Sequence, residues 1–226
     1  MKLTRSGCVV PDTSEIKKEL TVRPIVNADF GVAPPSFKVF RKAKSGLCVP
    51  RYYAEEKFGN VVEDIRPKPE KIKISFKGKL RDETHQNEAL SKAIEAGHGI
   101  LSLPCGFGKT TVSLAIACKL GYRTMIVVHK EFLANQWKER IQQFCPGASI
   151  GIVRQNKKEV NCDFVIAMLQ SLSLKEYSFE DFDSIGTLIV DEAHHICAKV
   201  FSQSLFKLCP KHAFGLSATP NRKDGL

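Results

Sequence analysis

The segment LPCGFGKTT, residues 103–111, is the feature that most restricts how this 226-residue chain can fold. Gly106 and Gly108 stand between an apolar run that ends at Leu103 and a helical pattern that begins at Thr110. Glycines let successive backbone N–H groups turn inward, and the following helix adds positive potential at its N-terminus. A strand, a loop and a helix in this order form a cradle for phosphate groups, so the segment predicts a nucleotide site.

The residues of this loop have expected roles in that site. Lys109 is expected to reach the β- and γ-phosphates, and the Thr110 hydroxyl to bind Mg²⁺. The usual pattern, G-x-x-x-x-G-K-[ST], would place glycine at position 103, where this chain has leucine. On this segment alone, a helix that merely follows a glycine-rich turn is the alternative. The predicted nucleotide contacts are Pro104, Cys105, Gly106, Phe107, Gly108, Lys109, Thr110 and Thr111.

Two adjacent carboxylates follow another apolar run in LIVDEAHH, residues 188–195. Asp191 at the end of a strand is expected to hold Mg²⁺, and Glu192 to orient and deprotonate an attacking water. An isolated Asp-Glu pair often only begins a helix. Because this pair comes 82 residues after Lys109 in an alternating α/β pattern, the two segments together predict hydrolysis of a nucleoside triphosphate, with ATP and Mg²⁺ as ligands.

Strand-like and helix-like stretches alternate from residue 80 onward. This rhythm is typical of an α/β domain in which a parallel sheet is flanked by helices. Strands are expected at 99–103, 123–128, 150–153, 164–167, 187–190 and 214–217, and helices at 84–96, 110–120, 131–144 and 197–208.

The pattern of residues 1–78 predicts a separate, small, basic module that contains β-strands. The α/β domain follows at 79–226. Short strands are expected at 37–40 and 47–49, and the alternation of Ile72, Ile74 and Phe76 predicts another strand over 71–80. Residues 1–85 carry 18 basic and 11 acidic side chains, and the whole chain has a formal net charge of +10. This charge favours a polyanion such as nucleic acid as partner, although a soluble surface alone would also account for it.

The eight cysteines include no C-x-x-C pair, and the six histidines show no zinc-ligand spacing. We therefore expect reduced thiols rather than a disulfide or metal framework. No apolar run approaches the 18 residues that span a bilayer, and the N-terminus has no long apolar core of a signal peptide. An intracellular protein of the cytoplasm or nucleus, without a membrane partner, is expected.

A third segment, GLSATP at 215–220, completes an ordered set with LPCGFGKT and DEAH. Over residues 80–226 this set resembles the first RecA-like domain of superfamily 2 helicases. The stretches VVHKEFLANQW and IAMLQSL are similar to two further motifs of that family. DEAHH and GLSATPNRKDGL favour the branch of type III restriction subunits and XPB-like DNA translocases. FKVFRKAKSGLCVPRYYAEEKFG also resembles the N-terminal region of helicases of large cytoplasmic DNA viruses.

The resemblance implies further roles for individual residues. Gln86, with Arg81 beside it, would recognise adenine, although the family usually places that glutamine about three residues after Leu-Arg and here it is five. Trp137 and His195 are expected to pack or cap. Coupling of nucleotide state to strand binding would involve His194, Ser217 and Thr219, and contacts to the nucleic-acid backbone would come from Lys130, Gln136 and Ser171.

The family also uses a second RecA-like domain, whose arginine fingers complete the ATP site, and the present sequence contains no match to it. We therefore expect a fragment of a larger helicase that hydrolyses ATP poorly by itself. Three interpretations remain open: a helicase or translocase half, an ATPase switch that acts on protein, and a degenerate domain that only binds nucleic acid. DNA is favoured as substrate and RNA is possible.

Overall fold

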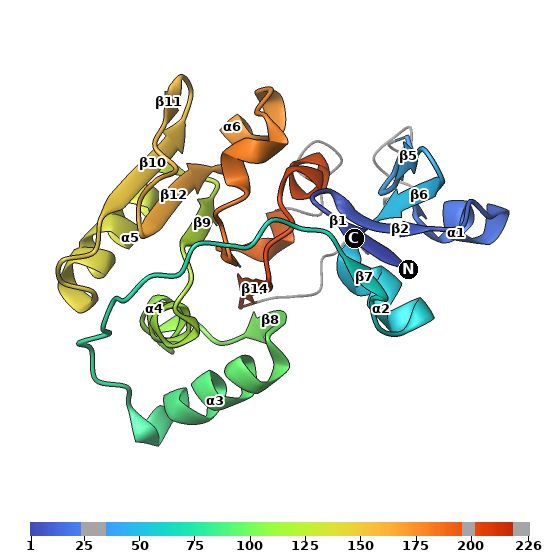
Figure 1. Ribbon diagram of the computed structural model, residues 1–226. Helices are drawn as coiled ribbons and strands as arrows, with labels where there is room; N and C mark the ends of the chain where they lie inside the picture. The colour runs from blue at the N-terminus through green and yellow to red at the C-terminus, as the bar shows by residue number, and fades with distance from the viewer. Residues whose placement is uncertain (24–34, 196–201, 219–226) are drawn as a thin grey trace, which may run out of the picture.

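The computed structural model describes residues 1–23, 35–195 and 202–218. These residues form a small mixed module at the N-terminus and a larger α/β unit built on a seven-stranded sheet (Figure 1).

The N-terminal module is organised around a five-stranded sheet in the order β5-β6-β2-β1-β7. Its small core gathers Leu3, Leu47 and Val49 from the strands and Ile16 and Ala54 from two helices. The expected strand at 37–40 is shorter than predicted, because the hairpin partner of β6 is β5 and not β4. The elements are β1 Lys2–Thr4, β2 Gly7–Val10, α1 Ser14–Glu19, β3 Thr21–Val22, β4 Phe37–Lys38, β5 Arg41–Ala43, β6 Gly46–Val49, α2 Arg51–Phe58 and β7 Glu63–Asp64.

The larger sheet has the order β11-β10-β12-β9-β13-β14-β8, and all neighbours are parallel except the hairpin of β10 with β11. The carboxyl ends of six strands therefore meet at one edge, where the connecting loops converge. The strands are β8 His98–Ser102, β9 Thr124–Val128, β10 Ile150–Arg154, β11 Lys157–Lys158, β12 Phe164–Met168, β13 Thr187–Val190 and β14 His212–Ser217.

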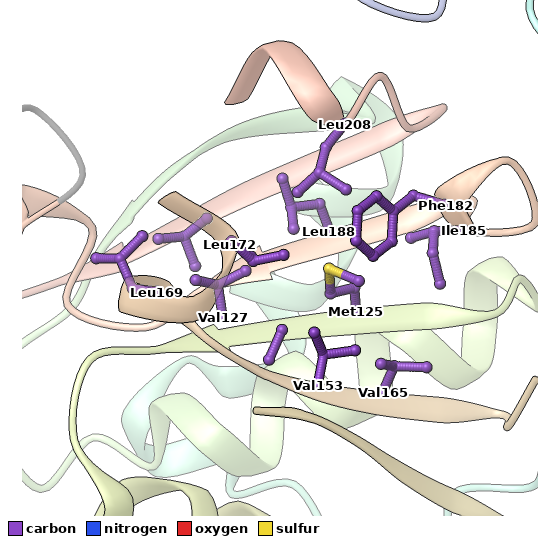
Figure 2. Packing of buried hydrophobic residues seen from close by; sticks show 12 residues of the cluster. Met125, Val127, Val153, Val165, Leu169, Leu172, Phe182, Ile185, Leu188 and Leu208 are labelled. Atoms are coloured by element: carbon purple, nitrogen blue, oxygen red, sulfur yellow. The ribbon is translucent and has the colours of Figure 1, made fainter. Parts of the chain in front are cut away.

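Each face of this sheet has its own hydrophobic core, and β9 contributes alternately to both. Ile126 packs with Trp137 and Ile141 on the face that carries α4 and α5. Met125 packs on the other face, in the cluster that Figure 2 shows. This is why β9 is apolar at almost every position. The helices are α3 Gln86–Ala96, α4 Lys109–Leu120, α5 Glu131–Phe144 and α6 Leu169–Leu174, with 3₁₀ turns at Asp82–Thr84, Phe179–Phe182, Ala193–His195 and Gln203–Lys207.

Two expected elements differ in the structure. Residues 71–80 form an extended strap rather than a strand, because their only ladder contact within the described chain is an isolated bridge between Lys71 and Tyr122. Their alternation reflects one face packed on the core, which an extended segment shows without strand pairing. The described part of the expected helix 197–208 is only the 3₁₀ turn Gln203–Lys207, since residues 196–201 lie outside the described ranges.

The N-terminal module is docked to the larger unit by two arginines. Arg66 Nη1 donates to the carbonyl oxygen of Pro210 at 2.7 Å, and Arg51 Nη1 donates to that of Lys211 at 3.0 Å. The ring of Tyr52 stacks on that of His98, with centroids 4.0 Å apart. The module therefore holds the segment that leads into β14 and touches the start of β8.

Candidate nucleotide site

The glycine-rich loop joins β8 to α4 and adopts backbone angles that only glycine tolerates well. Gly106 has φ 79° and Gly108 has φ 92°. Leu103 does not need to be glycine, because it continues the sheet, donating its N–H to the carbonyl oxygen of Ser217 at 3.1 Å. Its own carbonyl accepts a 3.3 Å hydrogen bond from Lys109 Nζ. The departure from the usual motif at position 103 is therefore compatible with the loop geometry.

Gln86 and Arg81 hold this loop from outside. Gln86 is 2% exposed; its Nε2 donates to the carbonyl oxygen of Phe107 at 2.5 Å, and its Oε1 accepts from the backbone N–H of Arg81 at 2.8 Å. Arg81 Nη2 donates to the carbonyls of Gly106 and Phe107 at 3.1 and 3.0 Å. The 3₁₀ turn Asp82–Thr84 takes up the two extra residues of spacing, so the chain still brings Gln86 to the loop.

The two carboxylates follow β13. The backbone N–H of Asp191 bonds to Val127, which extends the strand pairing by one residue. Asp191 Oδ1 accepts from the N–H of Glu192 at 3.1 Å, and Oδ2 accepts from Trp137 Nε1 at 2.8 Å. Burial raises the pKa of Asp191 above its usual range, and the hydrogen bond from Trp137 opposes that rise. Glu192 has φ 50°, a left-handed conformation uncommon for glutamate that turns the chain sharply after the strand.

Strand β14 lies between β8 and β13, so Ser217 stands between the glycine-rich loop and the carboxylates. His194 Nδ1 is 3.4 Å from Ser217 Oγ and 3.5 Å from Glu192 Oε2. One imidazole thus joins the two strand ends. Thr219, assigned to the same coupling role, lies outside the described residues. The rings of His195 and His129 contact each other at an interplanar angle of 40°, with centroids 4.0 Å apart.

The three residues assigned to nucleic-acid contacts lie in different environments. Lys130 and Gln136 are exposed, at the N-terminal cap of α5 and on its surface. Ser171 is 9% exposed, and its Oγ accepts from the N–H of Gln155 at 3.0 Å. Its hydroxyl therefore already holds a neighbouring loop.

Trp137 contacts the site, although the sequence predicted only a packing or capping role for it. Its ring is buried in the core between α5 and the sheet, while its indole N–H reaches Asp191. A buried tryptophan usually finds an acceptor for its N–H, but its spacing gives no indication of which one.

The residues present fit Mg²⁺ arriving with a nucleotide. Mg²⁺ is usually held by one or two carboxylates together with phosphates and water, and Asp191 and Thr110 supply suitable oxygens. Within the described ranges, no group of three or more His, Cys, Asp or Glu side chains is arranged to hold a metal by itself. The seven cysteines of those ranges are free thiols, and Cys118 Sγ lies 3.5 Å from Cys145 Sγ. None of the described helices is both long and apolar enough to cross a bilayer.

A parallel sheet with a glycine-rich loop, paired carboxylates and a serine-bearing strand between them defines a RecA-like P-loop domain of the superfamily 2 type. Residues 49–222 match the family described as "Type III restriction enzyme, res subunit", and the chain belongs to this family. The predicted α/β fold and the predicted family resemblance are both confirmed.

The chain is similar to several viral and archaeal proteins. It is 32% identical to "Putative ATP-dependent RNA helicase L396" of Acanthamoeba polyphaga mimivirus, over 100% of the chain and 46% of that protein. It is 33% identical to "Putative helicase 161L" of Invertebrate iridescent virus 6, over 95% of the chain and 50% of the relative. It is also 32% identical to "DNA 3'-5' translocase XPB2" of Sulfurisphaera tokodaii, over 78% of the chain and 39% of that protein. The chain thus spans about half the length of the first two relatives.

Solved structures share the fold at lower identity. The UvsW helicase from bacteriophage T4 superposes with a TM-score of 0.60 at 15% identity, covering 91% of this chain and 84% of that one. The SWI2/SNF2 ATPase core of Sulfolobus solfataricus, solved in complex with dsDNA, gives 0.54 at 20% identity, covering 68% and 35%.

Proposed function

We propose that this chain is the ATP-binding half of an ATP-dependent nucleic-acid helicase or translocase. The observation that carries the proposal is the convergence of Lys109, Asp191 and Glu192 at the carboxyl edge of one sheet, with Ser217 on the strand between them. This arrangement suits hydrolysis of a phosphoanhydride and a mechanical response to it.

The residues of the site have separable tasks in this proposal. Lys109 leaves the carbonyl of Leu103 and places its charge on the β- and γ-phosphates. Asp191 and Thr110 would hold Mg²⁺, which supplies neutralisation of phosphate charge. Glu192 orients the attacking water and accepts its proton. Gln86 would bind adenine, and this binding could affect the conformation of the loop because Gln86 already donates a hydrogen bond to the carbonyl of Phe107.

Coupling to the nucleic acid would run through His194. Its Nδ1 atom lies close to both the Glu192 carboxylate and the Ser217 hydroxyl, so a change at the γ-phosphate can alter the end of β14. We propose Lys130, Gln136 and Ser171 as contacts to the strand backbone and Thr219 as the partner of Ser217. For Ser171, such a contact requires that the hydrogen bond from the N–H of Gln155 to the Ser171 hydroxyl be broken.

The named relatives support a nucleic-acid partner, which they name as RNA in one case and DNA in another. One relative is titled an RNA helicase, another a DNA translocase, and one structural neighbour was solved with dsDNA. We favour DNA, and we propose an intracellular protein whose ATP site is completed by a second RecA-like domain. Because the phosphates of DNA and RNA are chemically the same, motor motifs that contact phosphate suit either nucleic acid.

The test is ATP turnover by a protein that contains this chain, measured with and without single- and double-stranded DNA and RNA. We expect stimulation by one of these polymers, with salt-sensitive binding. A Lys109→Ala variant, which loses the phosphate-binding ammonium, serves as the inactive control. Turnover that no polymer stimulates, together with no salt-sensitive binding, would favour an ATPase that acts on protein.

A further inference from the structure

The strap at residues 71–80, within the long segment between β7 and α3, carries a row of lysines along one side. In Figure 1 it is the long teal segment that leads to α3. Burial alternates strictly over residues 71–80, with odd positions exposed and even positions partly buried. Ile74 and Phe76 pack against the core between the sheet and its helices. The exposed side consists of Lys71, Lys73, Ser75, Lys77 and Lys79.

This segment concentrates the positive charge of the chain. Residues 66–81 hold seven basic side chains and one acidic one, Glu70, so their net charge is +6 of the chain's +10. Among the residues that the structure describes, Lys71, Lys73, Lys77 and Lys79 form no ion pair with a carboxylate. The row therefore presents charge that the protein itself does not neutralise.

The backbone of the strap is pinned, so the lysines stand at set intervals. The N–H of Ile72 donates to Gly121 at 3.0 Å, and the N–H of Lys77 donates to Phe144 at 2.7 Å. The rings of Phe76 and Phe144 contact each other, with centroids 5.8 Å apart. Binding of a ligand to the row therefore does not require the strap backbone to become ordered first.

The interval of the row suits a phosphate backbone. Alternate residues of an extended chain are about 6.6 Å apart, and Lys71 to Lys79 span at most about 29 Å. Each strand of a duplex carries one phosphate per roughly 3.4 Å of axis, so lysines two residues apart can meet about every second phosphate, with Ser75 at the position between Lys73 and Lys77. Lys119 lines the same shallow groove as Lys79 and extends the positive surface onto α4.

The strap begins at the sheet edge opposite the nucleotide site and ends next to Arg81, which bonds the glycine-rich loop. Lys71 bridges Tyr122, and Arg123 donates its N–H to the carbonyl of Glu70 at 2.9 Å, both just before β9 begins. The nucleotide loop and Asp191 lie where β8 and β13 end. Lys71, the first lysine of the row, therefore lies at the edge opposite the contacts proposed for the motor site.

We propose that this lysine row binds the phosphate backbone of a nucleic-acid duplex, as a second contact surface that is separate from the residues of the motor motifs. The proposal rests on the proposed nucleic-acid partner and adds a location that the motor motifs do not cover. An acidic protein is disfavoured, because the exposed side of the strap between Lys71 and Lys79 offers no apolar anchor for a protein interface.

The test compares two triple charge reversals in the same chain. The first variant, Lys73→Glu, Lys77→Glu and Lys79→Glu, reverses three of the four charges of the row. Lys18→Glu, Lys42→Glu and Lys44→Glu change net charge equally at exposed lysines of the N-terminal module, none of which forms a described ion pair. Binding of a fluorescent 20-base-pair DNA duplex (roughly 68 Å) is measured by anisotropy over a salt series.

We expect the strap variant to bind about tenfold or more weakly and its salt slope to fall by roughly 2 to 3, one per lost phosphate contact. The control variant should bind within about twofold of the unmodified chain. Equal losses in both variants overturn the proposal. Thermal melting verifies folding, and Lys→Gln versions of the same triple replace any variant that does not fold.

The outcomes separate this inference from the proposed function. If the unmodified chain binds no nucleic acid, the partner itself is wrong. If it binds but the strap variant binds equally well, only the strap surface is wrong. Competition by polyglutamate as strong as that by duplex DNA at equal charge would identify an acidic protein as the ligand and overturn the nucleic-acid assignment.

Discussion

Trp137 donates its indole N–H to the Oδ2 atom of Asp191 at 2.8 Å, joining α5 to the end of β13 across 54 residues of sequence. The ring itself is 1% exposed. A core side chain therefore orients the carboxylate that we propose holds Mg²⁺, and this makes Trp137 a positioning residue.

Replacing Trp137 with phenylalanine keeps an aromatic ring and removes the donor. We expect nucleotide binding to require about tenfold more Mg²⁺, since a hydrogen bond to a charged group contributes roughly 1.5–3 kcal/mol. The hydrogen bond also lowers the pKa of Asp191, so its loss should raise that pKa further and move the acid limb of Mg²⁺-dependent binding to higher pH. A fluorescent ATP analogue titrated with Mg²⁺ between pH 5 and 8 measures both effects.

The matched control is Phe164→Leu, which truncates a buried ring of the same core without touching the carboxylate. Both variants should melt at lower temperature, because each leaves space in the core. An equal shift of Mg²⁺ dependence in both would mean that Trp137 acts only through packing.

Glu192→Gln should retain ATP binding and lose at least about a hundredfold in turnover, because the amide cannot accept the proton of the attacking water. The substitution keeps the size and the left-handed backbone of position 192. Equilibrium binding and steady-state hydrolysis are measured on the same preparation. Normal turnover would refute Glu192 as the base.

Alanine at the two loop glycines should have unequal effects on stability. Both positions have positive φ, which costs an alanine roughly 1–2 kcal/mol. At Gly106 a Cβ meets no atom within 4 Å, whereas at Gly108 it would approach Gln86 Nε2 to 2.8 Å. Gly108→Ala should therefore destabilise more than Gly106→Ala in urea unfolding. A double-mutant cycle with Gln86→Ala should show coupling for Gly108 and none for Gly106.

Asp64→Asn tests the docking of the N-terminal module through pH. Side-chain hydrogen bonds from Arg66 lower the pKa of Asp64 below its ordinary value of about 3.9. A lowered folded-state pKa stabilises above the unfolded value and is lost as pH falls through the folded value. The variant should therefore melt at lower temperature than the unmodified chain at pH 7. The loss of stability should be less than about 1 kcal/mol, because the Asp64 side chain is 47% exposed, and the difference should close in acid. A gap that persists at low pH would exclude the ion pair as its cause.

Local patterns predicted the strands and the nucleotide loop, because backbone conformation there depends on neighbouring residues. The segment TMIVV at Thr124–Val128 is a buried strand as expected, and Lys109 begins a helix that Gly121 ends. The alternation at 71–80 identified the buried side of the strap correctly. It did not reveal whether another strand would pair with the segment, since that depends on residues far away in sequence.

Long-range partners could not be predicted in the same way. The indole of Trp137 had to find an acceptor, yet only the packing of α5 against the sheet brings Asp191 to it. Likewise, the hydroxyl of Ser171 was equally suited to a phosphate or to a backbone N–H, and the fold places Gln155 beside it. The chemistry of the indole and hydroxyl groups determines which kinds of partner they can bind, and the fold determines which partner lies within reach.

The hydrogen bonds that Arg81 and Gln86 donate to the loop carbonyls have a thermodynamic consequence. Their donors occupy the carbonyl oxygens of Gly106 and Phe107 before any ligand arrives. The loop is thus preorganised, and a nucleotide loses little binding free energy to immobilising it. Association should then depend mainly on how well the phosphates match a cradle that already exists.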